Sequence, residues 1–443
     1  MYDPLIESSP APNQGYPSSY WAKSLDLIPK TNSLQTSVQA DVAVIGAGYT
    51  GLSAAYHLQK HYAKKVVVVD ANEAGWGCSG RNAGFVLPGT GRLSLLEMED
   101  KWGVDSAKGI FHEFMTSIET VQGLIEQGNI DCDKTPGGYL KLAHRRAKVA
   151  TLRTQAEKLN AQYGESVRFV NSKEVNRDFV NSANMYGGIY FDKCFGVNPL
   201  KLALGYLAMA NEAGVTVFGN SPVVDWQQSG ATHTLRTSHG QITADQVVIA
   251  TNGYTGTNLH DIVKQRHFPV LSSIIVTRPL TEQELSSIQI RFGLMAMDTR
   301  RKKYYYRLLP DNRILFGGRG AITGQQANDP INKQRLSKGL EATFPILKDI
   351  PIEHFWSGWV SASYDKYPRL GASDDESIFY SMGYCGSGLA FSTLAGKRLA
   401  QRICEPEALP QLPFWQTPLP KFPFSSFRRL GLKAFYLLAN IRD

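Results

Sequence analysis

The feature that most constrains the fold is a glycine-rich turn between a short apolar strand and an apolar helix. The strand is expected at residues 41–45, the turn reads Gly46-Ala-Gly-Tyr-Thr-Gly51, and residues 51–59 have helical periodicity. A second, fully apolar strand follows at 66–69. Strand, turn, helix and strand within about 30 residues form a βαβ unit, whose parallel strands lie in a sheet covered on both faces. The sequence therefore predicts an α/β domain.

This turn has the spacing of a dinucleotide-binding motif. Gly46 permits the tight turn, Gly48 lets the backbone approach a diphosphate, and Gly51 lets helix and strand pack closely. The diphosphate would lie at the helix N-terminus, where free N–H groups and the helix dipole favour negative charge. Asp70 ends the second strand, where an acidic residue accepts hydrogen bonds from ribose hydroxyls; a solvated strand-end carboxylate is the alternative. With all parts in register, the sequence predicts a bound dinucleotide.

Two further glycine-rich segments favour FAD over NAD. Residues 75–84 are dense in glycine and lack acidic side chains, so they suit a groove for a flat polar ring; a flexible surface loop is the alternative. Residues 382–388 again join an apolar strand, at 377–382, to a helix, at 389–404. The positive end of that helix would stabilise the negative charge of a reduced flavin, whereas reduced nicotinamide is neutral.

The rest of the chain predicts two domains, each discontinuous in sequence. Alternating segments at 273–277, 303–307 and 313–316 indicate an antiparallel sheet with one side facing solvent or substrate. The expected fold class is α/β: a Rossmann-like FAD-binding domain with a second, α+β substrate domain built on that antiparallel sheet. The expected boundaries are an N-terminal arm at 1–37, an FAD-binding domain at 38–92, 193–265 and 353–404, a substrate domain at 93–192 and 266–352, and a Pro-rich linker with a basic amphipathic helix at 405–443.

Composition excludes several classes of protein. The chain has 443 residues, 43% of them apolar, enough to bury the cores of two or three domains. No apolar run approaches the roughly 18 residues of a membrane span, and the N-terminus lacks the pattern of a secretory signal. The five cysteines are scattered and form no Cys-x-x-Cys pair, so we expect no disulfide scaffold, no metal site and a cytoplasmic location. The net charge is +8, but no basic run carries interleaved stacking aromatics, so no nucleic-acid partner is expected.

Several segments together resemble the D-amino-acid oxidase/sarcosine oxidase superfamily of FAD-dependent enzymes, and within it the gamma-glutamylputrescine oxidase-like amine oxidoreductases. The resemblance covers about residues 38–404, and Ser19-Tyr20-Trp21 resembles an arm of those proteins. It implies a D-amino-acid oxidase-like fold with the flavin face open to the second domain. It also implies hydride transfer from the carbon bearing an amine to flavin N5, giving an imine that hydrolyses. The segments are 44–58, 79–84, 250–254, 315–319, 365–371 and 383–389.

The resemblance also implies which residues contact FAD. The nucleotide contacts carry over to Gly46, Gly48, Thr50, Gly51 and Asp70, and the diphosphate and ring contacts to Ser79, Gly80, Arg81, Asn82, Ala83 and Gly84. The adenine side is expected at Val223, Thr251 and Gly253, and the pyrimidine end of the flavin at Gly386, Ser387, Gly388 and Leu389.

Three positions depart from the family's pattern. Sarcosine oxidases attach their flavin through a cysteine that would align near 366–369, where this chain has none, so a non-covalent FAD is expected. Ala390 stands where those enzymes have a lysine that binds the substrate carboxylate, and Leu315 stands where they have an oxygen-activating lysine. Both differences argue against a simple amino-acid substrate and against rapid reaction with O2. A quinone-type electron acceptor is therefore expected as the alternative to O2.

The substrate-facing candidates come from the predicted antiparallel sheet. Arg319 would bind a carboxylate or gamma-glutamyl group as a bidentate fork, with a domain-interface salt bridge as the alternative. Tyr305 and Tyr306 alternate on one strand, so one of them faces the pocket side, or both pack in the core. Trp359 would form an aromatic wall for an amine by cation–π contact, with core packing as the alternative.

The predicted activity is oxidation of the C–N bond of an amine or N-substituted amino acid, with gamma-glutamylputrescine or a similar polyamine derivative as the leading substrate. An L-pipecolate or imino-acid dehydrogenase that passes electrons to a membrane quinone is the next hypothesis, and a non-catalytic flavoprotein is the alternative of another class. Residues 427–442 are basic and apolar, so they either lie in a membrane interface, with Arg428, Arg429 and Lys433 on lipid phosphates, or dock on protein.

Overall fold

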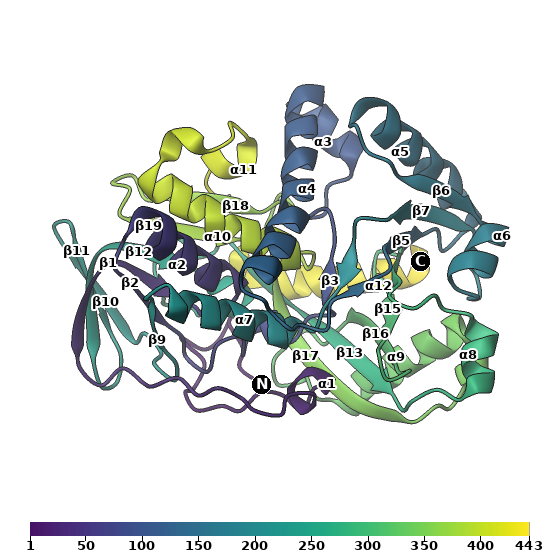
Figure 1. Cartoon of the computed structure of the whole chain (residues 1–443), viewed down its shortest axis with the longest axis horizontal. Coiled ribbons are helices and arrows are strands. Elements are labelled where there is room, and N and C mark those ends of the chain that lie inside the picture. Colours follow the sequence, from purple (N-terminus) through teal and green to yellow (C-terminus); the bar gives the residue numbers. More distant parts are fainter. Residues whose placement is uncertain (443) are drawn as a thin grey trace.

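The computed structural model describes residues 1–442 and contains two large sheets, which lie on opposite sides of the molecule in Figure 1. The first sheet has a parallel core. Its first strand, which begins the βαβ unit, lies between two parallel neighbours, so that Ala43 pairs with both Val67 and Val247. Its strands are β1 (Ser37–Ile45), β2 (Val66–Val69), β9 (Thr216–Phe218), β10 (Asp225–Ser229), β11 (Thr232–Arg236), β12 (Gln241–Ile249), β18 (Arg369–Ala372) and β19 (Ile378–Met382). The parallel order is β9-β2-β1-β12-β19, and the β10–β11 hairpin pairs with the first half of β12.

Both faces of this parallel core are covered. Val42 and Val44 belong to the cluster that includes helix α2 (Tyr49–Tyr62), whereas Ala43 and Ile45 belong to a separate cluster on the other face. Because neither face meets solvent, β1 and β2 read as continuous apolar runs rather than as alternating ones. The βαβ unit predicted from the glycine turn is confirmed.

The second sheet is antiparallel except where β14 and β5 pair in parallel. Its strands, in spatial order, are β17 (Ile352–Ala362), β13 (Phe268–Thr277), β16 (Ile314–Arg319), β15 (Tyr305–Leu308), β14 (Met295–Asp298), β5 (Tyr139–Leu142), β7 (Gly187–Phe191) and β6 (Arg168–Asn171). A small third sheet, β3 (Phe85–Val86), β8 (Phe195–Gly196) and β4 (Thr135–Pro136), lies in the order β3-β8-β4. The predicted antiparallel sheet is thus confirmed.

Helices cover both sheets. The first sheet is covered by α2, α7 (Pro199–Glu212) and α10 (Leu389–Cys404), and α4 (Val104–Gln127) packs against α10. Ile288 of α8 (Glu282–Ile288) and Leu336 of α9 (Pro330–Thr343) belong to the core behind the second sheet. The remaining helices are α1 (Tyr20–Lys23), α3 (Leu95–Trp102), α5 (Val149–Gln162), α6 (Ser172–Glu174), α11 (Pro413–Gln416) and α12 (Arg428–Arg442).

The structure differs from the expected boundaries in two places. Strand β17 pairs with β13 along its length, so residues 353–362 extend the antiparallel sheet instead of beginning the last segment of the FAD-binding domain. The Pro-rich segment after 404 is not a free linker, because Phe414 and Trp415 are buried against Phe391. Within residues 1–442, no helix combines the length and the apolar character needed to cross a membrane.

Candidate functional site

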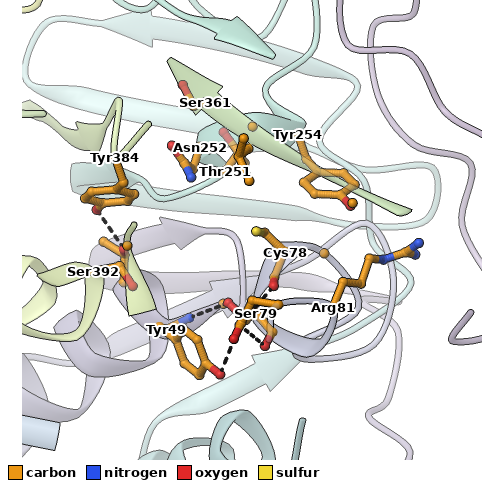
Figure 2. Close-up of a pocket in the computed structure, with 18 of the residues that line it drawn as sticks. Tyr49, Cys78, Ser79, Arg81, Thr251, Asn252, Tyr254, Ser361, Tyr384 and Ser392 are labelled. Atoms are coloured by element: carbon orange, nitrogen blue, oxygen red, sulfur yellow. Dashed lines mark hydrogen bonds between the residues drawn. The ribbon is translucent and has the colours of Figure 1, made fainter. Parts of the chain in front are cut away.

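A large cavity lies where the carboxyl ends of the parallel strands meet the second sheet. Ile45, Val69 and Ala250 line it from the ends of β1, β2 and β12. Open α/β sheets bind ligands at the carboxyl ends of their strands, so this is the expected position for a nucleotide. Figure 2 shows Cys78 and Ser79 on one side of the cavity and Thr251, Asn252 and Tyr384 on the other.

The first glycine turn is held by close backbone contacts. Gly46 has a φ of +112°, and a Cβ atom there would lie 2.9 Å from the carbonyl oxygen of Ala250. A Cβ atom on Gly51 would lie 1.9 Å from the carbonyl oxygen of Gly46, so helix and turn touch directly. Gly48 lines the cavity and is the N-cap of α2, without a side-chain cap. The contacts of Gly46 and Gly51 are those of a tight turn and of close helix packing, and the approach of Gly48 to a diphosphate stays a prediction.

The second glycine turn brings another helix start to the same cavity. Gly388 is the N-cap of α10, it also has no side-chain cap, and Gly386, Ser387 and Leu389 line the cavity beside it. The Oγ1 atom of Thr50, in the first turn of α2, lies 2.9 Å from the Oη atom of Tyr384. The positive ends of two helices therefore converge on one cavity.

Asp70 lies at the end of the cavity that the sequence assigns to the adenosine part. Its Oδ2 atom accepts a hydrogen bond from the N–H of Ala47 at 2.7 Å, and Oδ1 accepts one from the N–H of Asn72 at 3.0 Å. Burial raises the pKa of this carboxyl group to about 6. Val223, Thr251 and Gly253 line the same cavity, as do Ser8, Ser9 and Pro10 of the N-terminal arm, which no sequence motif indicated.

The 75–84 segment folds into a loop whose polar side chains mostly hold the loop itself. Arg81 donates from Nε to the carbonyl of Trp76 at 2.8 Å and from Nη1 to that of Ser357 at 3.2 Å. Asn82 donates from Nδ2 to the carbonyl of Ser79 at 2.8 Å, and its Oδ1 accepts from the N–H of Gly84. Of the six residues predicted here, Ser79, Arg81, Asn82 and Ala83 line the cavity, whereas Gly80 and Gly84 do not.

Two cysteine thiols line the cavity. Burial raises the pKa of the Cys78 thiol to about 11, and it raises the pKa of Cys385 as well. The thiolate is the nucleophilic form of cysteine, and burial disfavours the thiolate at both positions. This environment agrees with a cofactor held without a covalent bond.

The register of the second sheet decides which side chains face the cavity. Ser272 pairs with Arg319, and Tyr305 pairs with Met297, so these side chains lie on one face. All four line the cavity. The hydroxyl groups of Tyr305 and Ser272 lie 2.9 Å apart, and Ser272 donates to the carbonyl of Gly318 at 3.0 Å.

Two of the predicted catalytic residues do not line the cavity. Tyr306 points to the opposite face of the sheet, where it is fully buried and stacks on Phe316. Trp359 packs beneath the N-terminal arm and donates from Nε1 to the carbonyl of Tyr2 at 2.7 Å. Tyr305 is thus the one of the two neighbouring tyrosines that faces the cavity, and Tyr306 and Trp359 follow the alternative of core packing.

Lys303 is a cavity residue that the sequence reasoning missed. It lies two residues before Tyr305 and lines the same wall. Burial, and secondarily the neighbouring Lys141, lowers the pKa of its ammonium group to about 8. Lys303 and Tyr305 are two residues apart, and this spacing could have indicated that both face the cavity. A lysine before a strand is, however, ordinarily expected at the protein surface.

Ala390 and Leu315, the two positions that depart from the family's lysines, lie in different environments. Ala390 lines the cavity at the start of α10. Leu315 is fully buried with Trp21 and Leu200 and does not line the cavity, so its identity gives no information on the reaction with O2. Ile274, on the neighbouring strand, lines the cavity instead.

Comparisons with known proteins agree with this geometry. A family model described as "DAO: FAD dependent oxidoreductase" matches residues 41–402. The chain is 32% identical over 387 residues to the gamma-glutamylputrescine oxidoreductase of Escherichia coli K12. The aligned region covers 87% of this chain and 88% of that protein. Among solved structures, the glycine oxidase of Geobacillus kaustophilus superposes with a TM-score of 0.67 at 20% identity, covering 86% of this chain and 99% of the other. The L-proline dehydrogenase of P. horikoshii gives a TM-score of 0.68 at 19% identity, covering 87% and 96%; these two likenesses concern the fold alone.

The cavity suits FAD on its own chemistry. Two helix N-termini without side-chain caps supply N–H groups for anionic oxygens, one from each glycine turn. The Oγ atom of Ser361 is buried, lines the cavity and has no hydrogen-bond partner among the described residues, so a polar ligand atom would satisfy it. A Cβ atom on Gly48 would lie 2.8 Å from Ser79 Oγ, so no side chain fits there and the backbone of Gly48 itself lines the cavity.

Proposed function

The chain belongs to the DAO family of FAD-dependent oxidoreductases, and from this premise we propose that it oxidises the C–N bond of an amine that also carries a carboxylate group. It is an enzyme with non-covalent FAD rather than a flavoprotein that only binds a partner. Gamma-glutamylputrescine is the specific substrate that we propose. This compound is the substrate in the name of the Escherichia coli relative, which is 32% identical to this chain over 387 residues.

The observation that supports a carboxylate-bearing substrate is the charge on the cavity wall. Arg319 and Lys303 line the wall formed by the second sheet. Asp70, which follows β2 of the first sheet, is the one acidic side chain among the lining residues in the described part of the chain. A guanidinium group binds a carboxylate as a bidentate fork. A free diamine, which is positively charged at both ends, would meet two cations here and no carboxylate.

The chain's own residues would bind and orient this substrate. Arg319 would hold the carboxylate, and the Lys303 ammonium would add a second contact to it while charged. Phe85, Leu87 and Met297 line the cavity, so they would exclude water and contact an aliphatic chain. The bound FAD supplies the acceptor for a hydride from the carbon that bears the amine. The amine need only bind in its neutral form, so no side chain is assigned as a general base.

Anaerobic bleaching of the flavin absorbance tests this proposal. The panel pairs amines that differ in a carboxylate: gamma-glutamylputrescine with putrescine, and L-pipecolate, the second substrate suggested by the sequence, with piperidine. We expect bleaching by gamma-glutamylputrescine at concentrations at which putrescine leaves the flavin oxidised. Equal bleaching by both members of each pair would contradict the proposal, and bleaching by L-pipecolate alone would assign the smaller substrate.

The electron acceptor is part of the same proposal. The reduced enzyme would pass its electrons to O2 or to a quinone, and no residue of the cavity wall separates these two. Reoxidation of the bleached enzyme in aerated buffer, compared with reoxidation by a soluble quinone analogue under argon, distinguishes them by rate and by the peroxide formed.

A further inference from the structure

We propose that α12 and the turn before it form a docking surface for an anionic lipid bilayer. This inference concerns a surface outside the cavity and does not depend on the substrate proposed above. It rests on three observations: how α12 is fixed to the protein, which side chains its outer face exposes, and the charge of the surrounding segment.

The inner face of α12 is firmly attached. Leu432 packs with Phe268 and Val270 of β13, and Ala439 is fully buried. Arg428 donates from Nη1 to the carbonyl of His267 at 2.5 Å, and Arg429 forms an ion pair with Asp3 of the N-terminal arm. The helix is therefore fixed in orientation, and its outer face is a permanent part of the surface.

The outer face of α12 is apolar and exposed. Leu437 and Ile441 are 66% and 83% exposed, and Leu430 and Leu438 are exposed as well. Positions 430, 437 and 441 are seven and four residues apart, and 438 and 441 are three apart, so the four side chains form one stripe along the helix. Phe424 and Phe427, in the turn before α12, add two aromatic rings that are 82% and 64% exposed. A helix with one buried face and one exposed apolar face lacks its partner.

The charge around the stripe identifies the partner. Residues 408–442 contain no Asp or Glu but five basic residues, among them Lys421 and Lys433, whose side chains are exposed. An apolar helical stripe bordered by cations is the pattern that binds the interface of membranes with anionic lipids. A second copy of this chain, packed stripe to stripe, would bring like charges together, which is unfavourable at an interface.

The inner face of α12 lies close to the cavity described above. Val360 of β17 packs against the same apolar cluster as Leu432 and also lines the cavity. The helix α12 (yellow in Figure 1) thus contacts a strand of the cavity wall through its inner face and exposes the stripe on its other face.

Flotation of the purified holoenzyme with lipid vesicles tests the proposal. We expect binding to vesicles of phosphatidylcholine with phosphatidylglycerol, weaker binding at high salt, and little binding to phosphatidylcholine alone. The variant Leu430→Ser/Leu437→Ser/Leu438→Ser should lose binding by about tenfold or more, because it removes the inserted apolar area. The matched control is Val224→Ser/Phe292→Ser/Ile331→Ser, which changes three exposed apolar residues elsewhere and should bind as the wild type does.

Three results would overturn the proposal. The first is the absence of wild-type binding to the anionic vesicles at low salt, and the second is binding of the stripe variant as strong as that of the wild type. The third is a concentration-dependent dimer that the stripe variant abolishes, which would assign the surface to self-association. Flavin content and anaerobic bleaching, measured on every variant, show whether the holoenzyme is intact. Lys433→Glu is a second variant, at an exposed position, and should weaken binding to anionic vesicles alone.

Discussion

The Thr50 hydroxyl lies 2.9 Å from the Tyr384 hydroxyl although 334 residues separate them in the chain. Tyr384 donates its own proton to Ser381 Oγ at 2.9 Å, so Thr50 is the donor to Tyr384. Thr50 belongs to the helix that follows the first glycine turn, and Tyr384 belongs to the second turn. This pair fixes the two helix starts relative to each other at the cavity.

A double-mutant cycle on this pair tests whether it positions the FAD site. Thr50→Val and Tyr384→Phe should each weaken FAD binding, and the double variant should be little worse than either one. We expect a coupling of about 0.5–3 kcal/mol, measured by FAD titration of the apoprotein. Ser273→Ala removes a hydroxyl that is paired with Ser357 at 2.8 Å in the second sheet, and as the control it should leave FAD affinity unchanged. Fully additive effects of the two substitutions would show that the pair does not act as a unit.

Gly51→Ala should produce a protein with little bound flavin. A Cβ atom at this position would lie 1.9 Å from the Gly46 carbonyl oxygen, so α2 would be pushed away from the turn that faces the ligand. The ratio of flavin to protein absorbance in the purified sample measures the effect. Gly123→Ala is the control, because a Cβ atom on this residue of α4 meets nothing within 4 Å, and full flavin content is expected. Full flavin content in Gly51→Ala would contradict the close contact.

The affinity for a carboxylate ligand should fall as the pH rises through about 8. The pKa of Lys303 lies at about 8, below that of an ordinary lysine, so its ammonium group is charged at pH 7 and largely neutral at pH 9. Glutaric acid monobutylamide has a carboxylate and no amine that titrates in this range, and its binding can be followed by the flavin spectrum. Its dissociation constant should rise from pH 7 to pH 9 by up to about 10-fold, the limit set by the loss of one proton with a pKa near 8.

Lys303→Met gives the matched comparison for this pH dependence. The variant should bind the monobutylamide weakly at pH 7 and show no rise between pH 7 and pH 9. A rise that persists in the variant would assign the pH dependence to another group.

Glu113→Ala should lower the free energy of unfolding by about 3–5 kcal/mol, because it leaves a largely buried arginine without its partner. The Glu113 carboxylate accepts two hydrogen bonds from Arg398, at 2.6 and 2.9 Å, and one from Trp415 Nε1 at 3.1 Å, so it joins α4, α10 and α11. Urea unfolding measures the change. Glu119→Ala, an exposed carboxylate on the same helix, should change stability little, and equal effects of both substitutions would contradict the role given to the buried pair.

The sequence predicted the parts of the site that depend on local pattern. The glycine turns at 46–51 and 382–388 can be read locally, because φ values and helix starts are properties of short segments. It could not choose between Tyr305 and Tyr306, because that choice depends on which face of the second sheet meets the first domain. The orientation of the Trp359 ring depends on its hydrogen bond to the carbonyl of Tyr2. This contact joins segments that are far apart in the chain, so no local sequence pattern predicts it.

The same limit explains the errors in the domain boundaries. Strand β17 follows the second domain in the chain and precedes the last segment of the first, so its assignment depends on its pairing with β13. Phe414 and Trp415 stand among prolines, which indicate a linker, and their burial against Phe391 arises from tertiary packing. Long-range packing can override a compositional signal of this kind.

Anaerobic rapid mixing with gamma-glutamylputrescine, compared between the wild-type holoenzyme and Arg319→Met, measures directly whether the cationic wall selects the substrate. If Arg319 binds the carboxylate, the half-saturating concentration for flavin reduction should rise by about 10- to 100-fold, the scale of a lost charge-assisted contact, while the limiting rate changes far less. An unchanged half-saturating concentration, or no reduction of the wild-type flavin by this substrate, would contradict the proposed function.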